Sequence, residues 1–169
     1  QDEIGELIGS FNRLLETLGQ RKEALRESEN KFRSVSEHSL VGIYLIHEGV
    51  LKYVNPKFAE IFGYTVEECL DNMFFRDLVH PEDYVTVKEQ VRKRLSGEIQ
   101  SVNYAFRGIK KTSEIIHVEI FGTSIVLDGR PTVTGTILDV TLRKQAEEEK
   151  RSLEDRLQRA EKMEAMGTL

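Results

Sequence analysis

The sequence is poor in cysteine and proline, and it has no long apolar run. Its only cysteine, Cys69, can form neither an internal disulfide nor a metal site built from several cysteines, so a reducing compartment such as the cytoplasm is expected. No apolar segment approaches the roughly 20 residues needed to cross a bilayer, and no signal peptide precedes Gln1. The missing initiator methionine indicates a fragment of a longer protein.

An excess of positive charge is also lacking. The chain has 24 basic and 29 acidic residues mixed along its length, giving a net charge of −5. A protein that binds phosphate backbones needs a basic face, so a nucleic-acid partner is not expected. The 169 residues, 39% of them hydrophobic, are enough for one globular domain plus additional helical length.

The N-terminal end predicts a long helix with a coiled-coil seam. Ile4, Phe11, Leu18 and Leu25 recur every seven positions, and charged or polar residues fill most of the remaining positions. The pattern favours pairing with a second helix. An amphipathic helix lying on its own domain is the alternative, because tertiary packing also rewards such a stripe.

The C-terminal end, residues 142–169, predicts a second long helix without proline. Leu153, Leu157 and Ala160 belong to its apolar stripe, and the step from Leu153 to Leu157 interrupts a strict heptad and locally unwinds a supercoil. A solvated helix with scattered apolar residues is the alternative. Because both ends share this character, we expect a parallel homodimer held by the two helices.

The segment between the helices predicts short strands and short helices. Five β-rich runs are expected at 41–46, 50–54, 102–106, 116–120 and 133–140. Thr65 and Glu68 form a capping-box pattern, and Pro81 follows His80 at the expected start of another helix. The sum is an α+β fold, a five-stranded antiparallel sheet with helices inserted after the second strand and a long helix at each end.

Four sequence blocks carry a resemblance to the PAS domains of bacterial sensor proteins. In chain order they are Tyr53-Val54-Asn55-Pro56, Phe62-Gly63-Tyr64-Thr65, His80-Pro81-Glu82-Asp83, and Asp128-Gly129-Arg130-Pro131 with Gly135 and Asp139-Val140-Thr141. The resemblance covers residues 32–141 and implies a PAS sensor domain. Two departures from the family pattern are Lys111-Thr112-Ser113 in place of the usual Lys-Asp-Gly hairpin, and His117 at the following tryptophan position.

The flanks resemble two further families over shorter stretches. Asp2-Glu3-Ile4-Gly5 looks like the second helix of a HAMP linker, so residues 1–31 are expected to form a signalling coiled coil. Residues 162–169 look like the lead-in to the dimerisation and phosphoacceptor domain of sensor histidine kinases, which makes 142–169 the outgoing helix. These resemblances imply a domain on the cytoplasmic side of a membrane-anchored parent kinase that acts on a response regulator.

Flavin is not expected as a cofactor. The PAS family, which the chain resembles, has a light-sensing branch in which a cysteine forms the flavin adduct. The corresponding position here is Phe74, and the positions of the polar flavin anchors are Gly108, Val118 and Ile137. Cys69 lies one helical turn too early. The polar groups of flavin would face these residues without hydrogen-bond partners, and each unpaired group would cost about 1–3 kcal/mol of binding free energy.

Haem and metal ions are not expected either. Haem-binding PAS domains commonly take the iron ligand from the helix that corresponds to residues 84–95, which contains no histidine here. The four histidines, His38, His47, His80 and His117, lack the short spacings of metal ligands. We expect His80 at a helix start and His117 on the outer face of the sheet.

A group of apolar side chains is expected at the centre of the domain. Its members are Phe58, Phe62, Phe74, Phe75, Leu78, Tyr104, Phe106, Val118, Ile120 and Ile137. They either form a plain core or line a pocket for a small apolar or aromatic ligand that the Tyr104 hydroxyl orients. No nucleophile with an adjacent base and no phosphate-binding glycine loop is present, so this fragment is not expected to be an enzyme.

Asp139, Val140 and Thr141 are expected to relay the state of the sheet to the outgoing helix. Thr141 is a candidate N-cap for a helix beginning at Leu142, and the Asp139 carboxylate is within reach of Arg143 or Lys144. The alternative is a strand end and helix start without a signalling role. Sequence thus favours a relay module of a sensor histidine kinase, with a non-sensing dimerisation scaffold, or input to a cyclase or chemoreceptor, as alternatives.

Overall fold

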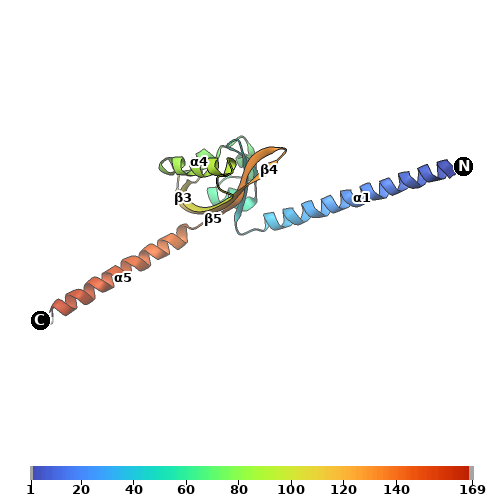
Figure 1. The fold of residues 1–169 in the computed structure, drawn as a ribbon. Helices are drawn as coiled ribbons and strands as arrows, with labels where there is room; N and C mark the ends of the chain where they lie inside the picture. The colour runs from blue at the N-terminus through green and yellow to red at the C-terminus, as the bar shows by residue number, and fades with distance from the viewer. Residues whose placement is uncertain (1, 168–169) are drawn as a thin grey trace. The chain divides into compact units, whose positions relative to one another are not determined.

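The computed structural model describes residues 2–167, and the chain divides into two compact units after Ser39. The first unit contains one helix, and the second contains the sheet, the inserted helices and the C-terminal helix (Figure 1). The elements are α1 (Asp2–Glu37), β1 (Gly42–His47), β2 (Val50–Val54), α2 (Pro56–Phe62), α3 (Val66–Leu70), the 3-10 turn η1 (Phe75–Leu78), α4 (Pro81–Leu95), β3 (Ser101–Ile109), β4 (Ile115–Leu127), β5 (Arg130–Asp139) and α5 (Thr141–Gly167).

The sheet has five strands in the order β2-β1-β5-β4-β3, and every neighbouring pair is antiparallel. The helical segments from α2 to α4 lie between β2 and β3 in the sequence. The predicted α+β architecture, with its inserted helices and a long helix at each end, is therefore confirmed. Figure 1 shows α4 running beside the sheet.

The last strand begins earlier than predicted, at Arg130 instead of residue 133. Asp128 and Gly129 have φ angles of 50° and 73°, and a two-residue hairpin turn with positive φ at both positions matches the twist of the flanking strands. The β4–β5 ladder consequently reaches the turn, where Leu127 pairs with Arg130.

Local sequence signals set the starts of the inserted helices. The capping box of α3 is present: Glu68 N donates to Thr65 Oγ1 at 3.1 Å, and Thr65 N donates to Glu68 Oε2 at 2.9 Å. His80 is the N-cap of α4, its Nδ1 accepting from Glu82 N at 3.3 Å, with Pro81 in the first turn. Both predicted helix starts are confirmed.

Asn55 joins the start of α2 to β1. The side chain is fully buried, and its Oδ1 accepts from Phe58 N at 3.0 Å and from Ile43 N at 2.7 Å. Its Nδ2 donates to Val41 O at 3.0 Å. One amide thus caps the helix and pairs with the strand, which fixes α2 against the sheet.

The core lies between the sheet and the inserted helices. Ile116, Val118 and Ile120 alternate inward on β4, and the neighbouring Ile115 and His117 are more exposed on the other face, as predicted for His117. Within residues 2–167, no helix combines the length and the apolar character needed to span a bilayer.

Candidate functional site

A cavity of about 40 Å³ lies inside the second unit. Eight of the ten residues predicted to form an apolar pocket line it: Phe58, Phe62, Phe75, Leu78, Tyr104, Phe106, Ile120 and Ile137. The aromatic rings pack on one another, with the centroids of Phe58 and Phe62 5.1 Å apart and those of Tyr104 and Phe106 6.0 Å apart. The inserted helices and the inner face of the sheet therefore form the walls of one cavity, and most of its lining side chains are apolar.

Two of the predicted pocket residues lie elsewhere. Phe74 is 42% exposed, and the guanidinium of Arg76 lies over its ring, so its placement in the pocket was wrong. Its backbone is extended, and neighbours in an extended segment point in opposite directions, so Phe75 faces the cavity and Phe74 faces away. Val118 is fully buried in the core but does not line the cavity.

Sequence reasoning missed seven residues that line the cavity. They are Tyr44, Ile46, Leu51, Val79, Val87, Val91 and Arg94. A signal for three of them was present in α4, where the spacing of Val87, Val91 and Arg94 by four and three positions places them on one helix face. Arg94 was overlooked because an arginine near a helix end is usually solvated.

The polar groups of the cavity wall are concentrated in three side chains. Tyr44 Oη, Arg94 Nη1 and Tyr104 Oη are buried, and among residues 2–167 none of the three forms a hydrogen bond of good geometry. The Arg94 guanidinium nevertheless lies close enough to Tyr44 to act as a weak donor to its hydroxyl. Burial raises the pKa of both tyrosines, and the positive charge of Arg94 opposes that rise in each case. A guanidinium and two hydroxyls therefore lie near one another in an otherwise apolar enclosure.

The junction between β5 and α5 is held by hydrogen bonds to β4. Val140 N donates to His117 O at 2.8 Å, and His117 N donates to Thr141 Oγ1 at 3.0 Å. Asp139 Oδ1 accepts from Thr141 N at 2.9 Å and also from the Thr141 hydroxyl. These contacts bring the predicted relay residues together at the start of α5.

Two details predicted for this junction were wrong. The helix begins at Thr141 instead of Leu142, and the Asp139 carboxylate receives the Thr141 amide while the Thr141 hydroxyl binds the β4 backbone. Arg143 pairs with Glu119 at 3.0 Å instead of with Asp139, because Glu119 lies on the outer face of β4 beneath the first turn of α5. The junction therefore carries two separate links, one made by Asp139 and Thr141 and one made by the ion pair.

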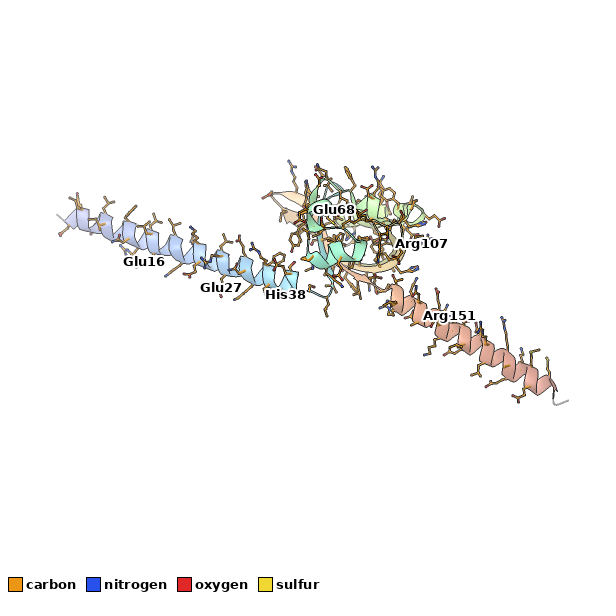
Figure 2. The ribbon with its side chains drawn as sticks, turned by 180° about the vertical axis from the view of Figure 1, so that it is seen from behind. Glu16, Glu27, His38, Glu68, Arg107 and Arg151 are labelled. Atoms are coloured by element: carbon orange, nitrogen blue, oxygen red, sulfur yellow. The ribbon has the colours of Figure 1, made fainter. Side chains whose placement is uncertain are left out.

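A second ion pair joins α4 to β3. Arg107 Nε and Nη2 donate to the two oxygens of Asp83 at 3.1 and 2.6 Å, and Arg107 N donates to Asp83 Oδ2 at 2.8 Å. These hydrogen bonds lower the pKa of Asp83 to about 2, with the Arg107 side chain as the largest cause. Figure 2 labels Arg107 on this unit.

The residues predicted to form a dimer interface are solvent-exposed in the single chain. They are Ile4, Phe11, Leu18, Leu25, Leu153, Leu157 and Ala160. Figure 2 shows the side chains of α1 standing out around the helix near Glu16 and Glu27. Among residues 2–167, no group of three or more His, Cys, Asp or Glu side chains is placed to hold a metal ion.

Comparisons with known proteins match the segment from β2 to β5 to one family. A family model described as "PAS fold" matches residues 51–137. Among solved structures, a PAS domain from a two-component sensor histidine kinase superposes with a TM-score of 0.56 at 18% identity, over 68% of this chain and 98% of that one.

Three relatives share sequence along most of the chain. They are the methyl sulfide methyltransferase-associated sensor of Methanosarcina acetivorans, 28% identical over 88% of this chain; the probable diguanylate cyclase DgcE of Escherichia coli, 29% over 85%; and the sensor histidine kinase TmoS of Ectopseudomonas mendocina, 26% over 98%. The chain spans 15%, 13% and 18% of the respective relatives. The names of two of these relatives describe sensors, and the name of the third describes a diguanylate cyclase.

Proposed function

The chain belongs to the PAS fold family and contains a PAS sensor domain, and from this premise we propose that it is the sensing and relay module of a dimeric sensor histidine kinase. The domain would bias the packing of the outgoing helix. The single observation that carries the proposal is the junction at Asp139–Thr141, where hydrogen bonds join the end of the sheet to the first residue of α5.

The junction suits a relay because it connects the helix to a strand that also lines the cavity. Ile120 and Glu119 are adjacent on β4; Ile120 faces the cavity, and Glu119 pairs with Arg143 of α5. A shift of β4 would therefore act on the helix through the ion pair and through the hydrogen bonds at His117. A conformational change in the PAS domain would in this way alter the first turn of α5.

We further propose three functional segments that a dimeric receptor requires. Residues 1–31 would be a HAMP-derived coiled coil, 32–141 the PAS domain and 142–169 the helix that leads to the kinase dimerisation domain. The exposed apolar stripes of α1 and α5 support a parallel homodimer, since pairing would cover them. This chain would lie on the cytoplasmic side of a membrane-anchored parent, and the parent would phosphorylate a response regulator.

The cavity supports binding of a small ligand without a large cofactor. Pockets for drug-sized ligands are typically about 300–1,000 Å³, and this cavity is about 40 Å³. A Cβ at Gly108, one of the positions that anchors flavin in related domains, would lie 2.9 Å from the Phe62 ring. We therefore propose that neither flavin nor haem is bound and that the purified chain is colourless.

A diguanylate cyclase parent is the second candidate. It is favoured by the relative DgcE, which is 29% identical over 147 residues. Both candidates use the same PAS domain and the same outgoing helix, and they differ only in the domain that follows. Incubating the purified full-length parent with ATP and with GTP separates them, because a kinase forms a phosphoprotein from ATP and a cyclase forms a cyclic dinucleotide from GTP.

The relay is tested by replacing both Asp139 and Thr141 with alanine in the full-length parent. We expect the PAS domain to stay folded, with a loss of about 1 kcal/mol for the missing cap, while basal output changes at least about fivefold. Asp128→Ala is a matched control. It also costs stability, because alanine disfavours the positive φ of residue 128, but it lies at the far end of β4 and β5.

The two variants are compared in the same assay of autophosphorylation or cyclase activity, and their folding is checked by near-ultraviolet circular dichroism. Unchanged output of the doubly substituted parent would contradict the relay and leave the junction as a helix start. An equal change in Asp128→Ala would also contradict it, because stability alone would then explain the effect.

A further inference from the structure

The cavity contains a positive charge that no carboxylate of the described chain neutralises. Arg94 is 1% exposed, and its Nε donates to the carbonyl of Gln90 in the same helix at 3.3 Å. Arg94 takes part in none of the ion pairs formed within residues 2–167, and the cavity wall contains no acidic residue. Burying a charge without a counter-charge costs free energy, so a bound anion would stabilise the Arg94 guanidinium at this position.

Two hydroxyls lie beside this charge. Tyr44 Oη and Tyr104 Oη, like Arg94 Nη1, form no hydrogen bond of good geometry among residues 2–167, and the contact between Arg94 and the Tyr44 hydroxyl is weak. Arg94 Nη1 and Tyr44 Oη both lie within 3.1 Å of the point that a Cβ at Gly122 would occupy, and Tyr104 lines the same cavity. In agreement with this placement, the charge of Arg94 lowers the pKa of each tyrosine against the larger effect of burial. Three buried groups that can donate hydrogen bonds therefore lie in one part of the cavity.

Two glycines leave the space in which these groups sit. A Cβ at Gly122 would lie 2.1 Å from Arg94 Nη1 and 3.1 Å from Tyr44 Oη, and a Cβ at Gly135 would lie 2.8 Å from Tyr44 Oη. Gly122 and Gly135 are partners across β4 and β5, and Gly135 also pairs with Tyr44 of β1. Any side chain at these positions would displace the guanidinium or the hydroxyl. The two glycines therefore provide the space that Arg94 and Tyr44 occupy.

We propose that the cavity binds a short-chain monocarboxylate of about the size of acetate or propionate. Its carboxylate would accept hydrogen bonds from Arg94 and the two tyrosines, and its alkyl chain would lie against Phe58, Ile120 and their apolar neighbours. The inference rests on the proposed sensing function, because it names the chemical class that the PAS domain would take.

Size and shape favour this class over other anions. At about 10–15 Å³ for each water-sized sphere, the cavity holds about three or four such spheres, which is close to the bulk of acetate or propionate. The two oxygens of a carboxylate suit a guanidinium. A chloride ion would leave the apolar wall uncovered, and inorganic phosphate would carry more charge than one guanidinium offsets.

Isothermal titration of the 169-residue chain with sodium propionate tests the proposal. We expect saturable binding of one propionate per chain, with a dissociation constant no tighter than about micromolar for a ligand of five heavy atoms. Propionamide, which has the same shape without the charge, should bind at least about tenfold more weakly. Absence of saturable propionate binding, or equal binding of propionamide or chloride, would overturn the proposal.

Two variants locate the binding site. Arg94→Met keeps an unbranched chain of similar bulk and should weaken propionate binding at least about tenfold, and Tyr104→Phe should weaken it by about fivefold. Arg92→Met is the control, because Arg92 lies on the same helix but on the surface, where it pairs with Glu89 and Glu98, and its binding should equal that of the wild type. Wild-type binding by both Arg94→Met and Tyr104→Phe would place propionate elsewhere.

The unliganded Arg94→Met protein provides a second measurement. Because a buried charge is replaced by an apolar group, its melting temperature should equal or exceed that of the wild type. A large fall in melting temperature would instead show that Arg94 supports the fold, and would count against a ligand role. Since titration uses the isolated chain and the relay experiment uses output of the parent, failure of propionate binding leaves the junction test intact, and failure of the junction test leaves the binding result intact.

Discussion

Large apolar side chains are buried in the PAS domain and solvent-exposed on the two long helices. In the PAS domain Phe62 is 1% exposed, whereas Phe11 of α1 is 58% exposed and Leu157 of α5 is 62% exposed. The sheet and its inserted helices bury their apolar residues within one chain, whereas a single long helix cannot cover its own stripe. Apolar side chains are thus covered inside the PAS domain and left exposed on the long helices, where the proposed homodimer would cover them.

The largest effect is expected from a substitution in the core. Phe62→Ala removes a buried ring that packs on Phe58, and should lower the free energy of unfolding of the PAS domain by about 3–5 kcal/mol. All five tyrosines lie between residues 44 and 104, so tyrosine circular dichroism during urea unfolding reports on this domain alone. Phe11→Ala is the matched control, and should leave the transition unchanged.

An equal loss of stability in Phe11→Ala would contradict this difference between the two regions, because it would mean that the exposed stripe of α1 supports the PAS domain. A Phe62→Ala loss below about 1 kcal/mol would mean that the cavity collapses around the missing ring.

The next effect concerns the helices and appears only in association. The double change Leu18→Asp with Leu157→Asp should weaken the expected homodimer by about 100-fold, because charged groups would enter both apolar stripes. Sedimentation velocity over a concentration series measures this. Glu16→Ala is the control, since Glu16 lies five positions after Phe11, away from the seven-residue stripe.

A wild-type chain that sediments as a monomer at tens of micromolar would contradict the dimer. So would a doubly substituted chain that dimerises as well as the wild type, since another surface would then hold the two copies together.

The same contrast explains how much could be predicted from sequence. Strands and capped helices follow from local rules, so the alternation on β4 and the Thr65–Glu68 box led to the right elements. The cavity wall depends on tertiary packing. Arg94 faces inward only because Gly122 leaves room for it on another strand, and no local pattern reports that pairing.

At the junction between β5 and α5, too, sequence predicted the local elements but not the partners that come from a neighbouring strand. Thr141 was expected to cap the helix and Asp139 to pair with Arg143 or Lys144. Instead Asp139 accepts from the Thr141 amide, and the partner of Arg143 is Glu119, which is 24 residues away in sequence. Reach along the chain favoured Asp139, whereas the antiparallel pairing of β4 with β5 brings Glu119 to the helix. Partners contributed by neighbouring strands are therefore the part of the site that sequence alone did not identify.

A smaller effect should distinguish the two regions by pH. The folded pKa of Asp83, about 2, lies below the ordinary value of 3.8, so the Asp83–Arg107 pair stabilises the PAS domain above about pH 4, and this stabilisation is lost as the pH falls toward 2. We expect the free energy of unfolding to fall by only about 1 kcal/mol on acidification, because solvent screens this partly exposed pair. Asp83→Asn should lack this part of the acid sensitivity in urea unfolding between pH 5 and about pH 2.

Glu27→Gln is the comparison in α1, where Glu27 pairs with Lys31 on an exposed surface at 3.2 Å. It should leave the tyrosine transition unchanged at every pH. If Asp83→Asn and the wild type lost stability in parallel on acidification, the Asp83 carboxylate would not be the group that titrates.

The smallest effect is expected where the sheet meets α5. The Arg143–Glu119 pair is partly exposed, with Arg143 Nη2 3.0 Å from Glu119 Oε2, so breaking it should change the stability of the PAS domain by only about 0.5 kcal/mol. The pair nevertheless joins a strand of the cavity to the outgoing helix. Its loss should therefore change the output of the full-length parent far more than it changes unfolding, which no exposed ion pair within a single helix should do.

A charge exchange tests this directly. Arg143→Glu alone places like charges together and should alter basal output, and Glu119→Arg added to it restores an opposite pair and should return output toward the wild type. Arg92→Glu with Glu89→Arg is the matched exchange within α4, and should leave output unchanged. If output stays altered after both charges are exchanged, the ion pair does not carry the coupling, and the hydrogen bonds that His117 of β4 forms with Val140 and Thr141 would carry it instead.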